Sequence, residues 1–299
     1  MKVLNKKTII IRAKFIVKTI QKFLLRKMNN SPFLSGDSMA ELCDFIVPSP
    51  LPEQIQLRNG VINSKSIFIN GHDLGEFINL AGELLHEKVL ISGNSDQNFT
   101  SPIVLKSKPK LFLCQNNAIK NQIEIKTLPI GIENIKLARS GFKHQHRGVS
   151  SFKFLDRVLI PPMSPTNLTR VSVVQYAKKY PEIFDVKSEY LSTRKYFKLL
   201  KDYKFVFACE GNGFDTHRLW EILYKNAFPV VLRSDWTDSL DWLNLPILSI
   251  DKIEDVTKSN LREFFEKNSN FVARETPQLW IPYWKNLLFA KTKNENLLS

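Results

Sequence analysis

The sequence predicts an α/β protein in which two Rossmann-like domains face a cleft. Short apolar runs typical of buried strands alternate with longer segments of helical periodicity, a pattern typical of βαβ units and a largely parallel sheet. The alternation occurs before and after a polar, basic stretch at residues 139–153, which we interpret as a linker. A chain of 299 residues is long enough to bury two such cores. Because ligands bind at the carboxyl ends of parallel strands, we expect the functional site between the halves.

The first half contains the pattern of one α/β domain. A helix is predicted over Gly75–Glu87, because Phe77, Leu80, Ala81 and Leu84 recur at helical spacing. Apolar runs that end in polar residues are predicted strands. These runs are Ser66–Asn70, Lys88–Ser92, Lys110–Cys114 and Ile125–Ile132.

The second half repeats the pattern and ends in an amphipathic segment, Pro277–Lys291, with Trp280 and Trp284 on one helical face. Its predicted strands are Arg157–Ile160, Lys204–Cys209 and Pro229–Arg233, and its predicted helices are Thr169–Lys179, Asp215–Lys225 and Leu261–Asn268. We divide the chain into a basic amphipathic segment (1–30), an N-terminal domain (31–150), a C-terminal domain (151–276), and a terminal helix with its tail (277–299), which we expect to cross back to the first domain.

The net charge of +14 is concentrated at the N-terminus. Residues 1–30 carry nine Lys or Arg and no Asp or Glu, so residues 31–299 contribute only +5. Cations recur every four residues on one helical face, and apolar residues form a separate stripe, which is typical of a helix on an anionic membrane surface. The alternative is a solvated helix packed against the protein. The two stripes are Lys14, Lys18, Lys22 and Arg26, and Ile9, Ile16, Ile20 and Phe23.

Two further features bear on location. No run in the sequence reaches the roughly 18 uncharged apolar residues of a membrane-spanning helix. The three cysteines, Cys43, Cys114 and Cys209, fit neither a disulfide framework nor a zinc site, which favours a reducing compartment. We therefore expect a cytoplasmic protein, peripheral on the inner face of a membrane.

The densest polar cluster, residues 210–221, follows a predicted strand and opens a predicted helix. Gly211 and Gly213 allow a tight turn and close approach to a ligand. Asp215 or Thr216 can cap the helix, whose first turn suits a phosphate. His217, Arg218 and Glu221 then share one side of the predicted helix. Arg218 could neutralise a diphosphate, and Glu221 could accept hydrogen bonds from ribose hydroxyls. The alternative is an ordinary turn followed by a surface ion pair.

This segment, EGNGFDTHRLWEILYKNAFPVV, resembles the C-terminal donor-site segment of exostosin-like glycosyltransferases, whose pattern is GNGxDxHRxWE. Three other stretches resemble the family in the same order, namely ISGNSDQ (91–97), LPIGIEN (128–134) and TNLTR (166–170). The four span residues 91–233, roughly half the chain, and depart from the family at Gly93, where a histidine is usual.

The resemblance implies a GT-B fold and a nucleotide-sugar donor site. Carried over by position, the donor-binding residues are Asn167, Arg170, Glu210, Gly211, Asn212, Gly213, Asp215, Thr216, His217, Arg218 and Glu221. The sequence contains no Asp-x-Asp pair, so we expect no metal and no cofactor. GT-B enzymes instead stabilise the leaving diphosphate with helix N-termini and basic side chains.

The catalytic base is expected on the N-terminal domain. The candidates are His72, Asp73 and Asp96, which follow predicted strands, although each is also a plausible turn-capping residue. His144 and His146 lie in the basic linker, and we expect both to be solvated.

The predicted function is transfer of a sugar from a nucleotide-sugar donor to a hydroxyl of a glycan or lipid-linked glycan, independent of metal and with inversion. One alternative is a basic nucleic-acid-binding protein, although no recognised nucleic-acid-binding motif occurs in the sequence. The other is a catalytically degenerate glycosyltransferase that serves as a binding subunit.

Overall fold

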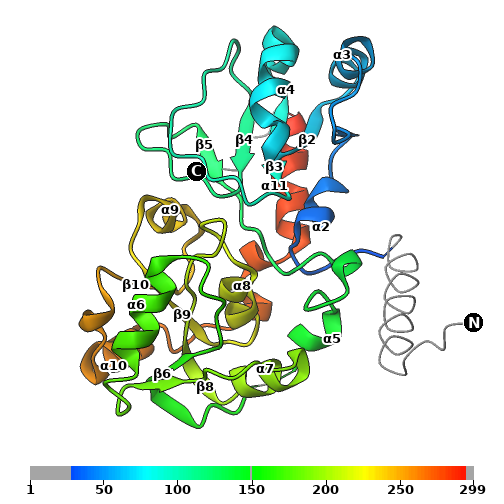
Figure 1. Cartoon of the computed structure of the whole chain (residues 1–299). Helices are drawn as coiled ribbons and strands as arrows, with labels where there is room; N and C mark the ends of the chain where they lie inside the picture. Colours follow the sequence, from blue (N-terminus) through cyan, green and yellow to red (C-terminus); the bar gives the residue numbers. More distant parts are fainter. Residues whose placement is uncertain (1–27, 149, 294–299) are drawn as a thin grey trace, which may run out of the picture.

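The computed structural model describes residues 28–148 and 150–293, which form two α/β halves, one above the other in Figure 1. Each half contains a five-stranded sheet, and every strand pairing within these two sheets is parallel. The prediction of two parallel α/β sheets is therefore confirmed. The basic segment 1–30 lies outside the described residues except for its last three. Among the described residues, no helix is both long and apolar enough to cross a bilayer.

The first sheet takes its strands in sequence order. Because crossovers between parallel strands are right-handed, such an order places the connections on one face of the sheet. The connecting helices α3 (Gln54–Ile62) and α4 (Leu74–Ala81) share a hydrophobic cluster with alternate strand residues, among them Ile67, Ile69 and Leu90. The strands are β1 (Phe45–Ile46), β2 (Ser66–Asn70), β3 (Val89–Gly93), β4 (Leu111–Cys114) and β5 (Ile125–Thr127).

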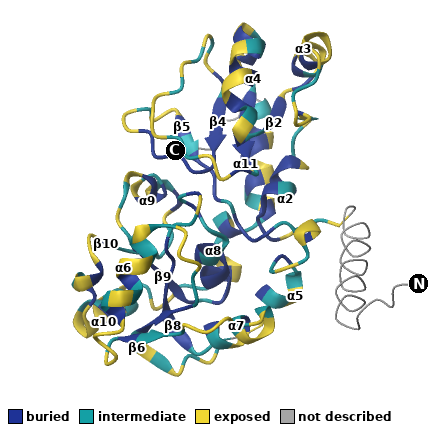
Figure 2. Ribbon diagram, in the orientation of Figure 1, coloured by how far each residue is buried: buried dark blue, intermediate teal, exposed yellow. Residues whose placement is uncertain are grey.

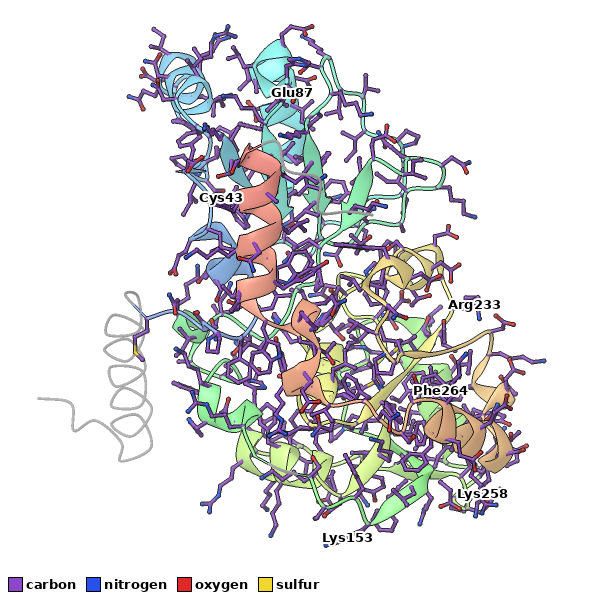
Figure 3. The ribbon with its side chains drawn as sticks, turned by 180° about the vertical axis from the view of Figure 1, so that it is seen from behind. Cys43, Glu87, Lys153, Arg233, Lys258 and Phe264 are labelled. Carbon is purple, nitrogen blue, oxygen red and sulfur yellow. The ribbon has the colours of Figure 1, made fainter. Side chains whose placement is uncertain are left out.

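The opposite face of the first sheet is covered by helix α11 (Ile281–Lys293), from the far end of the chain, together with α2 (Gly36–Ala40). Figure 3 shows α11 lying across these strands. Phe68, Ile91 and Leu113 on this face share a hydrophobic cluster with Leu287 and Leu288 of the helix. The sheet is therefore buried on both faces, as its nearly continuous apolar strands require.

The terminal helix begins later than its periodicity predicts. Residues Pro277–Leu279 form a 3₁₀ turn, and Trp280 is extended and bridges Phe33 before the helix starts at Ile281. Proline is favoured in the first turn of a helix, where its missing N–H costs nothing, and Pro282 occupies that turn.

The second sheet has the order β10-β9-β8-β6-β7, so the chain moves to one side of β6 and then to the other. The point at which the direction reverses lies between β6 and β8. Ligands of open α/β sheets bind outside the carboxyl ends of the strands at such a point. The strands are β6 (Phe154–Ile160), β7 (Phe184–Val186), β8 (Tyr203–Phe207), β9 (Phe228–Leu232) and β10 (Leu248–Ile250).

Five helices accompany the second sheet, and α8 leaves the carboxyl end of β8 through the polar cluster. Figure 2 shows β8, β9 and much of α8 buried, whereas α7 and α10 carry exposed residues. The helices are α6 (Leu168–Ala177), α7 (Thr193–Leu200), α8 (His217–Tyr224), α9 (Asp235–Asp238) and α10 (Lys258–Lys267).

One hydrophobic cluster joins the two halves. It contains Leu113 of the first sheet, Trp220 of α8 and Trp284 of α11. The buried hydroxyl of Tyr224 accepts a hydrogen bond from the Leu34 amide and donates one to the Leu279 carbonyl. The relative position of the halves is thus held by apolar packing as well as by loops.

The linker contains a short helix, α5 (Lys143–His146). His144 is exposed, as expected, but the expectation that His146 is solvated is wrong. The His146 ring packs 5.0 Å from the Phe197 ring and 5.7 Å from the Phe33 ring, and its Nε2 donates to the Ser140 carbonyl at 2.6 Å. Burial lowers the pKa of His146 to about 3, so the ring is neutral and serves packing.

Candidate functional site

The carboxyl ends of the two sheets face each other across the polar cluster. The loop after β8 donates backbone N–H groups to two asparagines of the first half, from Phe214 to Asn98 at 2.9 Å and from Asp215 to Asn116 at 2.8 Å. Asn98 follows β3 and Asn116 follows β4. Loops at the ends of both sheets therefore meet, and two cavities lie beside this junction.

The first cavity has a volume of about 500 Å³ and lies at the reversal point between β6 and β8. Its walls come from the loop after β6, the loop before α7 and the first turns of α8. This is the position expected for a ligand of an open α/β sheet. Residues that line it include Pro162, Arg170, Tyr196, His217, Arg218 and Glu221.

The start of α8 opens into the first cavity. Thr216 occupies the N-cap position and lines the cavity, but its side chain makes no capping hydrogen bond. The first amides of a helix lack partners within the helix, and the helix dipole adds positive potential there. An anion in the first cavity would therefore meet amide donors that the protein's own cap leaves unused.

Arg218 lines the cavity with part of its donor set uncommitted. One terminal nitrogen donates to the Pro162 carbonyl at 2.9 Å, and the guanidinium lies 5.9 Å from the centre of the Tyr196 ring. The buried Nε has no hydrogen-bond partner among the described residues. Buried polar groups are rarely left without a partner, so an unpaired guanidinium nitrogen at a cavity wall is typical of a ligand site.

Glu221 is the buried carboxyl of the cavity, with only 4% of its surface exposed. Burial raises its pKa, although His217 and Arg218 nearby act in the opposite direction. The hydroxyl of Tyr196 is also buried and has no hydrogen-bond partner among the described residues. A buried carboxyl and a buried phenol at the wall of one cavity suit a ligand that carries hydroxyl groups.

Arg170 lines the same cavity, but its guanidinium is mostly committed to the protein. It donates to the carbonyls of Glu210 at 2.7 Å and Ser164 at 3.1 Å. Its pKa is lowered, first by burial and then by the neighbouring Arg218. Arg170 therefore braces the loop after β8 against the loop after β6, and adds positive charge to the cavity.

Asn167 and Glu210 also stabilise the contact between the loop after β8 and the start of α6. The Asn167 side chain caps α6 by accepting from the Arg170 amide, and it donates to the Gly211 carbonyl at 3.2 Å. A side-chain oxygen of Glu210 accepts from the hydroxyl of Thr169 at 3.4 Å. Neither Asn167 nor Glu210 is among the residues that line the first cavity, so the structure places both behind the expected donor site.

The two glycines of the cluster act differently from expectation. Neither has a positive φ, so no left-handed turn requires them. A Cβ at Gly213 would lie 3.0 Å from the Asn116 side chain, and one at Gly211 would lie 3.1 Å from the Arg170 guanidinium. Both glycines therefore permit close packing within the protein. Asn212 likewise points to the first half and donates to Asp96 at 3.4 Å.

Asp215 lies in the interface between the halves and is absent from the lining of both cavities. Its carboxyl is 3% exposed and accepts from the Ile130 amide and from the Trp220 indole, each at 2.8 Å. Burial raises its pKa to about 7, although these donors act in the opposite direction. Asp215 therefore connects the LPIGIEN segment to α8, and of the two residues expected as the helix cap, Thr216 occupies the N-cap position.

We expect Asp215→Asn to remove a pH-dependent loss of stability. The folded pKa of about 7 exceeds the ordinary value of 3.8, so the contribution of this carboxyl to stability is complete below pH 3.8 and is lost as pH rises through 7. The loss amounts to about 3 kcal/mol between pH 5 and pH 8. The variant should also lose about 2 kcal/mol at pH 5, because its amide nitrogen must face one of two donors.

Urea unfolding at both pH values tests this expectation. The exposed Asp241, replaced by asparagine, provides the matched control and should keep the wild-type pH profile. If Asp215→Asn keeps that profile as well, the buried carboxyl does not titrate as described.

The second cavity has a volume of about 430 Å³ and lies mainly on the first half. His72 and Asp96 both line it, as expected of residues at the strand ends that face the cleft. Asp73 does not line it and occupies the N-cap position of α4. The remaining polar lining includes the side chains of Asn70, Asn94, Asn134 and Lys136.

His217 lines both cavities. Its Nδ1 lies 2.9 Å from the carbonyl oxygen of Gly131. Because a carbonyl can only accept, Nδ1 carries the hydrogen, and in the neutral ring Nε2 is left as an acceptor. The sequence predicted a donor-site role for this residue, and the structure adds its contact with the second cavity.

Gly93, the departure from the family pattern, has little room for a side chain. A Cβ there would lie 3.1 Å from Gln115 and 3.2 Å from Phe68. The side chain of Gln115 accepts from the Asn94 amide at 2.8 Å and fills the space beside Gly93. The role of Gln115 was not visible in the sequence, because its partners are distant along the chain.

No protein-family model matches this chain, and a comparison with curated proteins finds no match either. Among the described residues, no group of three or more His, Cys, Asp or Glu side chains is arranged to hold a metal ion. The functional interpretation therefore rests on the geometry of the two cavities and on the sequence motifs.

Proposed function

We propose that the protein is a GT-B glycosyltransferase that binds a nucleoside diphosphate sugar in the first cavity. The observation that carries the proposal is the meeting of three features at one place: the reversal point of the second sheet, the start of α8, and the partly uncommitted guanidinium of Arg218. A diphosphate at the start of α8 would accept from the first-turn amides and from Arg218. Arg170 adds a second positive charge to the same wall.

The nucleoside is assigned to the outer part of the first cavity. Glu221 and the Tyr196 hydroxyl supply acceptor and donor capacity for ribose hydroxyls. The loop before α7 contributes Tyr190, which lines the cavity and is 92% exposed, so its ring is free to stack on a base.

The acceptor is assigned to the second cavity, whose asparagine and charged side chains suit sugar hydroxyls. His217 stands between the two ligands and is proposed as the catalytic base. The acceptor hydroxyl oxygen attacks the anomeric carbon as its proton passes to Nε2 of His217. The bond from that carbon to the diphosphate oxygen breaks, and its electron pair leaves on the diphosphate. This single displacement inverts the anomeric carbon, and the imidazolium then returns its proton to solvent.

His72 and Asp96 remain candidates for the base, since both line the second cavity. His217 is preferred because it alone of the three also lines the first cavity, where the anomeric carbon must lie. Asp73 is not proposed, because it is absent from the lining of the second cavity.

Thermal unfolding with a panel of UDP-, GDP- and CMP-linked compounds tests the proposal. A ligand at 100 times its dissociation constant should stabilise the protein by about 2.7 kcal/mol, which raises the melting temperature. Stabilisation by one nucleotide class with release of the free nucleotide supports an enzyme. Stabilisation without release over long incubation with acceptor glycans indicates a degenerate binding subunit. Stabilisation by oligonucleotides alone would replace the proposal with nucleic-acid binding.

A further inference from the structure

The folded part of the protein carries a basic surface on α5, α7 and the linker between the halves. The linker (residues 139–153) contains Arg139, Lys143, Arg147 and Lys153 and no acidic residue. The segment 192–202, which includes α7, contains Arg194, Lys195, Lys198 and Lys201 with one acid, Asp202. These segments together carry +7, more than the +5 of residues 31–299 as a whole. The charge of the folded part is therefore concentrated in these two segments.

The two segments lie side by side. The His146 ring of α5 packs 5.0 Å from the Phe197 ring of α7, and Figure 1 shows the two helices as neighbours. The amides of Ser151 and Lys153 donate to the carbonyls of Lys201 and Asp202 at 3.2 and 2.8 Å. Linker and helix therefore run together along one side of the second half.

Most of these cations are available to a partner. Arg147, Arg194, Lys195 and Lys198 are exposed. None of the four forms an ion pair with a carboxylate in the part of the chain that the structure describes. Lys153 is the exception within the surface, because it pairs with Asp202 at 3.4 Å. The side chains buried beneath α7 are Phe197 and Leu200, so its charged residues face outward.

The basic N-terminal segment is joined to the same surface. Asn30 is fully buried, and its amide nitrogen donates to the carbonyls of Gly141 at 2.6 Å and Glu133 at 3.2 Å. Gly141 lies in the linker, two residues before α5 begins. The described part of the chain therefore begins beside the basic surface, directly after a sequence segment that carries nine cations.

We propose that α5, α7 and the linker form a docking face for an anionic membrane surface. Positive charge on the protein attracts acidic lipid headgroups, at about 1 kcal/mol for each Lys or Arg near the surface. One feature of the sequence favours lipid over nucleic acid. Residues 1–30 have an apolar stripe separate from their basic stripe, which a bilayer buries.

The docked orientation brings the second cavity close to the lipid. Lys136 and Leu137 line that cavity, and Arg139 of the basic surface lies two residues after Leu137 along the chain. Leu137 is 40% exposed, although it is apolar. A hydroxyl-bearing headgroup at the membrane surface would therefore reach the second cavity. This orientation is independent of which reaction the first cavity supports.

Sedimentation of the full chain with lipid vesicles tests the proposal. Vesicles of phosphatidylcholine mixed with phosphatidylglycerol should retain the protein, and vesicles of phosphatidylcholine alone should not. The double variant Lys195→Gln/Lys198→Gln should lower the partition coefficient about thirtyfold, because two cations near the surface are lost. Neither side chain lines a cavity or packs in the core.

The matched control is Lys106→Gln/Lys108→Gln, which removes the same charge from an exposed loop at the opposite end of the molecule. It should change the partition coefficient by less than about threefold, because screening weakens charges far from the lipid. Equal losses in the two double variants would overturn the docking face. So would equal binding to neutral vesicles, or retention by a single-stranded oligonucleotide without retention by acidic vesicles at the same ionic strength.

Discussion

Replacing Arg218 by alanine is expected to weaken nucleoside diphosphate binding by about a hundredfold, through the loss of charge-assisted hydrogen bonds. The guanidinium is held at the cavity wall by the Pro162 carbonyl and the Tyr196 ring, and its Nε has no hydrogen-bond partner in the described part of the chain. Arg218→Lys should weaken binding about tenfold, since lysine keeps the positive charge and loses the paired N–H donors of the planar guanidinium. Isothermal titration with the nucleotide found in the thermal panel measures both effects.

Arg233→Ala is the control for Arg218. Arg233 is exposed and pairs with Asp251 at 2.9 Å, outside both cavities. Its removal should leave the dissociation constant unchanged, because exposed ion pairs contribute little. If Arg218→Ala binds the nucleotide as tightly as the wild type, the diphosphate does not lie at the start of α8.

Replacing His217 by asparagine is expected to reduce kcat by a factor of about 100 to 10,000, the range for loss of a general base. Asparagine can place an amide donor near the position of Nδ1, so the hydrogen bond to the Gly131 carbonyl can persist while the Nε2 acceptor is lost. The nucleotide dissociation constant should therefore change little. The measurement is the rate of nucleoside diphosphate release beside its binding in the same variant.

Two further measurements separate a base from a structural residue. His217→Ala leaves a space between the two cavities, so added imidazole should restore part of the rate. His72→Asn and Asp96→Asn should retain most of the wild-type rate, since both residues line the second cavity and neither lines the first. If one of them abolishes the rate and His217→Asn does not, the base belongs to the first half.

The sequence predicts the parallel sheets because their strands are nearly continuous apolar runs between helical segments. Elements that it missed lack that contrast. Helix α3 buries only Leu57 and Val61 and contains Gly60, so it shows no apolar stripe. Helix α7 is short and strongly basic, and only Phe197 and Leu200 of it are buried. Edge strands β7 and β10 have three residues each, too few to define an alternation.

The candidate site was only partly accessible to sequence reasoning. Helical spacing places His217, Arg218 and Glu221 together, and all three line the first cavity. Asp215 looked like a helix cap because its neighbours along the chain are those of a cap. Its actual partners are the Ile130 amide, 85 residues away, and an indole on α8. The function of such a residue depends on tertiary contacts that local spacing does not encode.

The position of α11 on the first sheet also affects the order in which the protein folds during synthesis on the ribosome. Synthesis runs from the N-terminus, and domains generally fold as they emerge. The first sheet is an exception, because Phe68, Ile91 and Leu113 can pack against Leu287 and Leu288 only after β10 has been synthesised. Until then the apolar face that α11 covers in the folded protein is exposed to water and to neighbouring nascent chains. The two halves therefore mature together, because the core of the first sheet is complete only once α11 has been made.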